Sequence, residues 1–263
     1  MNAAPTRTDP VGAAFMTPRR YVYRTFGKEV PTMLDFDQFA YLTFDCYGTL
    51  IDWERGIVQA LRPVLASHGV ELSDDEMLER FGELESAAEK APYKRYREVL
   101  ATVLDGFGEA FGFTPTTDER ETFGGSVEHW PAFPDSPEAL KMLSQRFKLV
   151  ILSNVDDDLF AFSASRLGVE FADVITAQQV GSYKPDLRNF QVMLERTGNQ
   201  PERVLHVAQS LFHDIAPAKS LGLTTVWVNR RHDRPGFGAT PPAEATPDLE
   251  VPDLITLARQ TTQ

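Results

Sequence analysis

Apolar and polar positions follow two alternating patterns along most of the chain. Short apolar runs read as buried strands, because each spans only a few residues and is bounded by turn or polar residues. Between them lie segments with apolar residues at helical spacing, two of which end at Gly168 and Gly222. The predicted strands are residues 41–44, 149–152, 173–176, 204–208 and 224–228, and the predicted helices are residues 136–146, 156–167, 186–197 and 214–221, with a last turn and helix at residues 248–260. The alternation predicts an α/β fold with a Rossmann-like, doubly wound parallel sheet.

A long helical block follows the first predicted strand. Its apolar residues recur at helical spacing, and no strand pattern interrupts them. A capping box at Ser73–Glu76 marks the start of one of its helices. The predicted helices begin near residues 53, 73, 92 and 117, and the last of them ends near residue 129. We therefore predict a helical domain at residues 53–130, inserted into a core made of residues 38–52 and 131–263.

Composition excludes several classes of partner. The net charge of −12 disfavours nonspecific binding to nucleic acid or to anionic membranes. No apolar run approaches the roughly 18 residues that a membrane helix needs. Residues 1–37 show no clear periodicity and read as an N-terminal extension, in which Arg19 and Arg20 are not followed by the apolar segment of an export signal. The single cysteine, Cys46, excludes an intrachain disulfide and favours a cytoplasmic location.

Polar residues that could take part in catalysis follow the predicted strands. Parallel strands bring their carboxyl ends to one edge of the sheet, so these residues are expected to share a crevice. A carboxylate beside a lysine and hydroxyl groups can act as a nucleophile, and the lysine would keep it ionised. Taken singly, each residue also fits a turn, a helix cap or a solvated surface position. The candidates are Asp45 with Thr49, Ser153 with Asn154, Lys184, and Asp214.

Four segments resemble the sequence motifs of the haloacid dehalogenase superfamily. They occur in the order of that family, at Phe44–Asp52, Leu152–Asn154, Tyr183–Pro185 and Ser210–Asp214. The resemblance spans about residues 40–258 and implies a Rossmann-like core closed by an α-helical cap. The helical block at residues 53–130 would then be that cap.

Two positions depart from the magnesium phosphatases that make up most of this superfamily. Those enzymes carry a second aspartate two residues after the first, and here that position is Tyr47, a much weaker acid. Their fourth motif begins with a metal-binding aspartate, and here Gln209 stands there. A neutral amide is a poor Mg²⁺ ligand beside a carboxylate. Both replacements argue against metal-dependent phosphoryl transfer, and we expect no metal and no cofactor.

The Asp-x-Tyr-Gly-Thr pattern is instead similar to the (S)-2-haloacid dehalogenases. The resemblance implies that Asp45 attacks the α-carbon of a short 2-halocarboxylate, forming an ester that water then hydrolyses. Asp214 would orient or deprotonate this water, and Lys184 would hold both carboxylates. Halide is a good leaving group and needs no general acid.

The same resemblance implies roles for the remaining candidates. Thr49 and Ser153 would hydrogen-bond the nucleophile or the substrate carboxylate, and Asn154 would help to receive the halide. Family members often dimerise, so a homodimer is also expected. The candidates for substrate binding are Cys46, Tyr47, Arg80, Gln209 and Ser210.

Several positions depart from the dehalogenase pattern as well. Phe190 replaces a tyrosine, and Gln209 and Leu211 replace the serine and asparagine of the fourth motif. The asparagine orients the hydrolytic water in that family. The halide-binding arginine of the cap has no secure counterpart, Arg80 being the nearest in sequence. Two alternatives therefore stay open: a phosphatase acting on a small phosphate ester, and a divergent member that is not a hydrolase.

Overall fold

The computed structural model describes residues 34–90, 92–234, 236 and 238–262. Residues 1–33 of the predicted N-terminal extension lie outside the described residues. The chain from Leu34 onward forms one compact unit, which opens with a short 3₁₀ turn at Phe36–Gln38. None of the described helices is long and apolar enough to cross a membrane.

The core is a sheet of six strands that pair in parallel, in the order β3-β2-β1-β4-β5-β6. The strands are β1 (Tyr41–Phe44), β2 (Lys148–Ser153), β3 (Asp173–Thr176), β4 (Val204–Ala208), β5 (Thr224–Val228) and β6 (Leu249–Val251). The first strand lies in the middle, with Phe44 in register with Ile151 on one side and Val207 on the other. The predicted doubly wound α/β fold is confirmed. Because β1 is central, the residue that follows it lies at the middle of the sheet edge.

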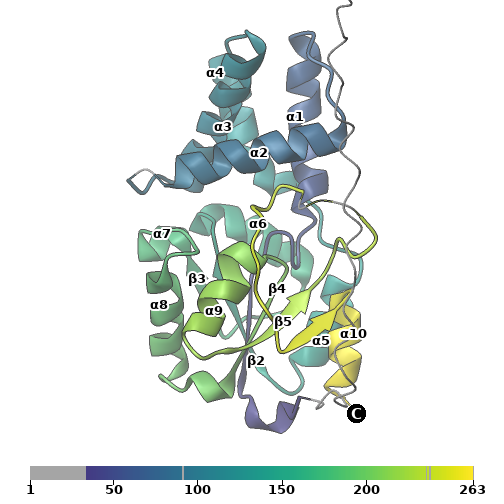
Figure 1. The fold of residues 1–263 in the computed structure, drawn as a ribbon, viewed down its shortest axis with the longest axis vertical. Coiled ribbons are helices and arrows are strands. Elements are labelled where there is room, and N and C mark those ends of the chain that lie inside the picture. The colour runs from purple at the N-terminus through teal and green to yellow at the C-terminus, as the bar shows by residue number, and fades with distance from the viewer. Residues whose placement is uncertain (1–33, 91, 235, 237, 263) are drawn as a thin grey trace, which may run out of the picture. The chain divides into compact units, whose positions relative to one another are not determined.

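Helices cover both faces of this sheet. Along β2, Leu149 and Ile151 belong to one apolar cluster while Val150 and Leu152 belong to another, so successive side chains are buried on opposite faces. Figure 1 shows α5 and α10 together at one side of the sheet and α8 and α9 at the other. The helices of the core are α5 (Ser136–Leu143), α6 (Asp157–Leu167), α7 (Ala177–Val180), α8 (Leu187–Thr197), α9 (Ala216–Ser220) and α10 (Leu254–Gln260).

The predicted helical block forms four helices above the carboxyl ends of the strands, and we call it the cap (Figure 1). Its third helix packs against the second and the fourth. The four helices are α1 (Trp53–Ser67), α2 (Asp74–Glu89), α3 (Tyr96–Phe111) and α4 (Thr117–Gly125), and a 3₁₀ turn at Ser126–His129 follows the last. The capping box predicted at Ser73–Glu76 is present. The division of the chain into separate cap and core domains stays a prediction.

Hydrogen bonds tie the start of α3 to the core. The backbone N–H groups of Tyr96 and Arg97 donate to the Asp156 carboxylate over 2.9 and 3.1 Å. The Tyr183 hydroxyl donates to the carbonyl of Lys94 over 2.8 Å. A carboxylate at a helix N-terminus satisfies free backbone donors and interacts favourably with the helix dipole. These contacts fix the end of the cap that lies nearest the third sequence motif.

The structure differs from the sequence prediction near the C-terminus and after β4. Residues 248–260, predicted to hold a turn and the last helix, form the edge strand β6 followed by α10, because Leu249 and Val251 extend along β5 before Asp253 caps the helix. The predicted helix at residues 214–221 starts three residues earlier as a π-helical turn, Leu211–Ile215, and continues as α9. The single helical turn α7 was not predicted from the sequence.

Candidate active site

Asp45 directly follows β1 and lies at the centre of the sheet edge. Its N–H still donates to the carbonyl of Val207 over 3.2 Å, so the backbone leaves the sheet only after this residue. The Thr49 hydroxyl donates to Oδ2 of Asp45 over 2.7 Å and accepts the N–H of Gln209 over 2.8 Å. The carboxylate is therefore held by the loop that follows its own strand, and that loop is tied to the end of β4.

Gly48 makes the tight turn after Asp45 possible. Its φ of +93° belongs to the region that side chains disfavour. A Cβ at this position would also lie 3.0 Å from Nε1 of Trp53 and 3.1 Å from Oε1 of Gln209. The glycine thus allows both the conformation and the close approach of these two side chains.

Lys184 connects the two carboxylates of the site. Its ammonium group donates to Oδ1 of Asp45 over 2.9 Å, to Oδ1 of Asp214 over 2.7 Å and to the carbonyl of Leu152 over 2.9 Å. All three of its protons are used, and only 1% of the residue is exposed. The sequence therefore correctly predicts that Lys184 lies between Asp45 and Asp214.

His206 completes the polar network beneath Asp214. Its Nε2 lies 3.1 Å from Oδ1 of Asp214, and its Nδ1 lies 2.8 Å from the hydroxyl of Thr43. Both Thr43 and His206 are fully buried within neighbouring strands. This pair was not predicted from the sequence, although a histidine and a threonine inside two apolar strands are a signal that buried polar groups must pair.

Charges in this network act differently on the two aspartates. Burial raises the pKa of Asp45 above its ordinary value, although Lys184 opposes the shift. Burial also acts to raise the pKa of Asp214, but Lys184 and His206 outweigh it and hold this pKa below its ordinary value. Asp45 is therefore the more basic of the two carboxylates, and Asp214 is the more firmly ionised.

Asn154 positions the backbone of Lys184. Its amide oxygen accepts the N–H of Lys184 over 2.7 Å, and its amide nitrogen donates to the carbonyl of Lys184 over 3.1 Å. One amide hydrogen is left over for other partners. The neighbouring hydroxyl of Ser153 is buried and has no hydrogen-bond partner among the described residues. The remaining amide hydrogen of Asn154 is thus available to a molecule bound in the pocket beside Asp45, whereas Ser153 does not line that pocket.

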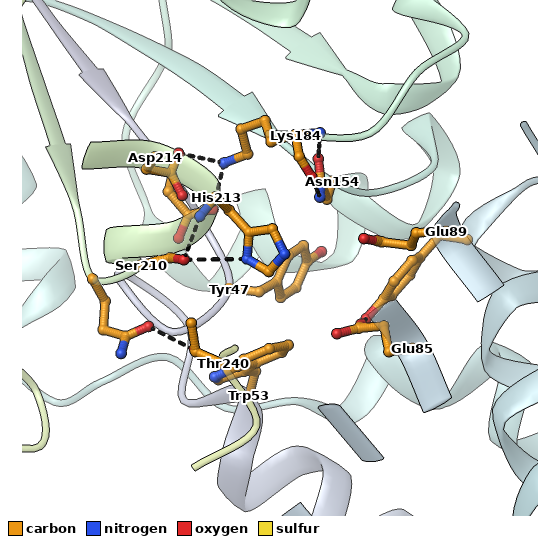
Figure 2. A pocket seen from close by; sticks show the side chains of 13 residues that line it. Tyr47, Trp53, Glu85, Glu89, Asn154, Lys184, Ser210, His213, Asp214 and Thr240 are labelled. Atoms are coloured by element: carbon orange, nitrogen blue, oxygen red, sulfur yellow. Dashed lines mark hydrogen bonds and ion pairs between the residues drawn. The ribbon is translucent and has the colours of Figure 1, made fainter. Parts of the chain in front are cut away.

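A small pocket lies between the core and the cap, and Figure 2 shows the side chains that line it. Its cavity volume is about 30 Å³. The core contributes Asp45, Asn154, Lys184, Gln209, Ser210 and Asp214. The cap contributes Trp53, Glu85, Glu89 and Tyr96. Such a space suits a substrate of a few atoms.

Tyr47 lines the same pocket, at the position where the phosphatases carry their second aspartate. Its hydroxyl lies 3.0 Å from Oγ of Ser163, and its ring packs edge-on against Trp130. Burial raises the pKa of Tyr47 well above its ordinary value. The hydroxyl is therefore a poorer proton donor than an ordinary tyrosine.

Two carboxyl groups of α2 face the pocket, and the sequence analysis missed both. Glu85 and Glu89 are one helical turn apart and point toward the core (Figure 2). The Tyr96 hydroxyl donates to Oε1 of Glu85 over 2.6 Å. Burial raises the pKa of Glu85 to about 7. Burial together with the Glu85 charge raises the pKa of Glu89 well above its ordinary value.

We expect the Glu85→Gln variant to be more stable than the wild type at alkaline pH. The folded protein favours protonated Glu85 over the range between its ordinary pKa of 4.5 and its folded pKa of about 7, so wild-type stability falls as pH rises through this range. The pKa shift of Glu85 corresponds to about 3 kcal/mol of folding stability. Glutamine can still accept a hydrogen bond from the Tyr96 hydroxyl. Urea unfolding at pH 8 should show the gain, and the same measurement at pH 4.5 should show almost none. An equal gain at both pH values would contradict this account.

Two predicted substrate-binding residues do not line this pocket. Arg80 lies on the exposed surface of α2 and pairs with Glu83 over 2.9 Å. It points away because it is five residues from Glu85, which turns it to another side of the helix. Cys46 is fully buried in the apolar core behind Asp45. Among the described residues that line the pocket, Lys184 is the one side chain with a permanent positive charge.

A family model describes most of this chain. The model of the haloacid dehalogenase-like hydrolases matches residues 40–222. The chain belongs to this family. The resemblance that the four motifs indicate is thus confirmed, and the matched range includes every member of the Asp45, Lys184 and Asp214 network.

Individual relatives within the haloacid dehalogenase-like family differ in activity. (S)-2-haloacid dehalogenase 1 of Pseudomonas sp. is 27% identical over 81% of this chain and 94% of its own length. Glyceraldehyde 3-phosphate phosphatase of Methanothermobacter thermautotrophicus is 32% identical over 37% of this chain and 44% of its own length. The structure of L-2-haloacid dehalogenase from Xanthobacter autotrophicus with chloropropionic acid covalently bound has a TM-score of 0.72 at 20% identity, covering 85% of this chain and 98% of that one. This structural likeness shows a shared fold.

The donor set of this family member fits a divalent cation poorly. The described residues contain no cluster of three or more acidic, histidine or cysteine side chains that could hold a metal ion. Near Asp45 and Asp214, the third position of the phosphatase metal site is the amide of Gln209, whose Oε1 already accepts from Thr240 over 3.3 Å. Mg²⁺ prefers carboxylate and water oxygens in octahedral geometry. The chain thus lacks the third charged ligand of such a site.

Proposed function

We propose that this protein is a metal-independent hydrolase that removes halide from short 2-halocarboxylates through an ester on Asp45. The observation that carries the proposal is the environment of Asp45. Its carboxylate lies at the centre of the sheet edge, is oriented by Lys184 and Thr49, and opens onto a small pocket. Tyr47 stands where a general acid would be needed for a poorer leaving group.

The first step is a displacement at carbon. One carboxylate oxygen of Asp45 attacks the α-carbon of the substrate, and the carbon–halogen bond breaks with its electron pair leaving on the halide. An ester between Asp45 and the α-carbon results. The raised pKa of Asp45 supports this role, because a more basic carboxylate is a better nucleophile. Lys184 keeps the group ionised, and Thr49 limits its rotation.

The second step restores the carboxylate. Water attacks the carbonyl carbon of the Asp45 ester and the bond to the alkyl oxygen breaks. One proton of the water ends on that oxygen, the other is released to solvent, and a 2-hydroxy acid leaves. Lys184 donates to Oδ1 of Asp45, so it can stabilise the negative charge that develops on that carboxyl group. Asp214 holds Lys184 in place from the other side. The product would have the opposite configuration at its α-carbon, since attack and departure occur on opposite sides.

An anionic substrate can bind only if the acidic side chains of the cap do not repel it. The pKa of about 7 means that the protonated form of Glu85 is present at neutral pH, and the pKa of Glu89 is shifted in the same direction. A protonated carboxyl group can donate a hydrogen bond to a carboxylate or a halide. Together with the free amide hydrogen of Asn154, these groups provide neutral hydrogen bonds for the substrate in place of an arginine.

Halide release from racemic 2-chloropropionate tests this proposal. We expect the wild-type enzyme to release chloride from up to half of the racemate, because a displacement site of fixed handedness accepts one enantiomer. The rate should be unchanged by excess EDTA. No halide release from chloro, bromo and fluoro acids would rule the proposal out. Hydrolysis of a phosphate ester that requires Mg²⁺ would instead favour the phosphatase alternative.

A further inference from the structure

Hydrolysis of the ester requires a group that takes a proton from water. Asp214 is constrained in this task, because its Oδ1 is already bound to Lys184 and His206, while its Oδ2 has no hydrogen-bond partner among the described residues. The asparagine that orients this water in related enzymes is replaced by Leu211. Another basic side chain in the pocket would account for the second step.

His213 occupies such a position. It lies in the π-helical turn Leu211–Ile215, in which the N–H of Ile215 donates to the carbonyl of Ser210 over 3.1 Å. π-Helical turns are rare and often occur at functional sites. The imidazole ring enters the same pocket as the Asp45 carboxylate (Figure 2).

Ser210 fixes the orientation of this ring. Its hydroxyl oxygen accepts the backbone N–H of His213 over 2.8 Å and lies 3.1 Å from Nδ1 of the same residue. The edge of Phe212 packs against the imidazole at a centroid distance of 4.9 Å. Nε2 has no hydrogen-bond partner among the described residues, and Figure 2 shows it on the pocket side of the ring. With Nδ1–H donating to Ser210, Nε2 carries a free lone pair.

We propose that His213 is the general base for hydrolysis of the Asp45 ester, an inference that rests on the proposed function. Nε2 takes a proton from water as the water oxygen bonds to the carboxyl carbon of Asp45. The bond between that carbon and the alkyl oxygen then breaks, and the proton on Nε2 passes to this oxygen. The 2-hydroxy acid leaves, the second proton of the water passes from the Asp45 carboxyl group to solvent, and Asp45 and His213 return to their initial states.

The surroundings of His213 favour its neutral form. Burial lowers the pKa of His213 to about 4, and the nearby Lys184 acts in the same direction against the opposing Asp214. From the cap, Glu89 lines both the pocket at Asp45 and the adjoining groove that His213 also borders. Tyr183 and Lys184 border that groove from the core side. At neutral pH the imidazole is therefore able to accept a proton.

The His213→Gln variant separates the two half-reactions. Glutamine removes the basic nitrogen, so we expect a burst of one halide per active site at the wild-type rate and then turnover reduced about 10²-fold or more. Mass spectrometry of the stopped reaction should find the 1-carboxyethyl ester of Asp45 accumulated on the variant. A merely structural role for His213 would instead slow the burst, because misplaced groups would affect the attack as well.

Two further variants serve as controls. His232→Gln makes the same change at a half-exposed histidine outside the pocket and should leave the burst and turnover unchanged. Ser210→Ala frees the ring of His213 and should also accumulate ester, to a smaller extent. Wild-type turnover by His213→Gln, or loss of its burst, would overturn the role of His213 while leaving the proposed function intact. A wild-type enzyme that releases no halide would instead remove the proposed function itself.

Discussion

Asp45→Asn should abolish halide release while leaving the protein folded. The amide of asparagine does not attack carbon, so the rate is expected to fall by about 10⁴-fold or more, as for loss of other catalytic nucleophiles. The expected stability follows from the pKa of Asp45, which burial raises. A group whose ionised form is disfavoured by folding costs stability at neutral pH, so a neutral side chain there should leave the protein equally or more stable.

Chloride release and urea unfolding, both at pH 7, test this prediction together. The matched control is Asp253→Asn, which changes the N-cap of α10 to another good capping residue far from the pocket. The control variant should keep both activity and stability. If Asp45→Asn retained more than about one hundredth of the wild-type rate, Asp45 would not be the attacking group.

Lys184→Met should impair both the reaction and the fold. Methionine fills similar space but leaves Asp45 and Asp214 facing each other in a buried site without a counter-charge. Removal of one partner from a buried ion pair typically costs about 3 to 5 kcal/mol. The pKa of both carboxyl groups should rise when the lysine charge is removed, so that Asp45 becomes protonated and loses its nucleophilic form. A fall in kcat/KM on the order of 10³-fold is expected.

The pH dependence of unfolding identifies the cause of this loss. In the variant, the folded state takes up protons on Asp45 and Asp214 as pH falls, so the stability deficit relative to wild type should be smaller at pH 5 than at pH 8. Lys219→Met is the control, because its partly exposed pair with Asp248 should contribute at most about 1 kcal/mol. A deficit independent of pH would show that the lysine contributes packing alone.

Much of this arrangement could be predicted from the sequence because it depends on local patterns. Apolar runs and helix caps identify the strands and helices, and parallel strands bring the residues that follow them to one edge. This is why Asp45, Lys184 and Asp214 could be predicted to meet before their distances were known. The edge strand β6 was missed because three residues are too few to establish an alternating pattern, and a proline follows directly.

The cap side of the pocket could not be predicted in the same way. Which residues of α2 face the core depends on how the helix is rotated above the sheet, and this rotation is set by tertiary contacts such as Tyr96 with Glu85. The sequence shows many charged residues on this helix and does not reveal that Glu85 and Glu89 turn inward while Arg80 stays outside. The placement of His213 depends likewise on a π-helical turn that no sequence period indicates.

A single turnover in H₂¹⁸O tests the central claim most directly. With enzyme in excess over 2-chloropropionate, an ester on Asp45 requires that the oxygen given to the product comes from the carboxylate, while the solvent oxygen enters Asp45. We predict unlabelled 2-hydroxypropionate and a peptide containing Asp45 that carries one ¹⁸O. Label in the product of this first turnover, with none on Asp45, would mean direct attack by water and would contradict the account.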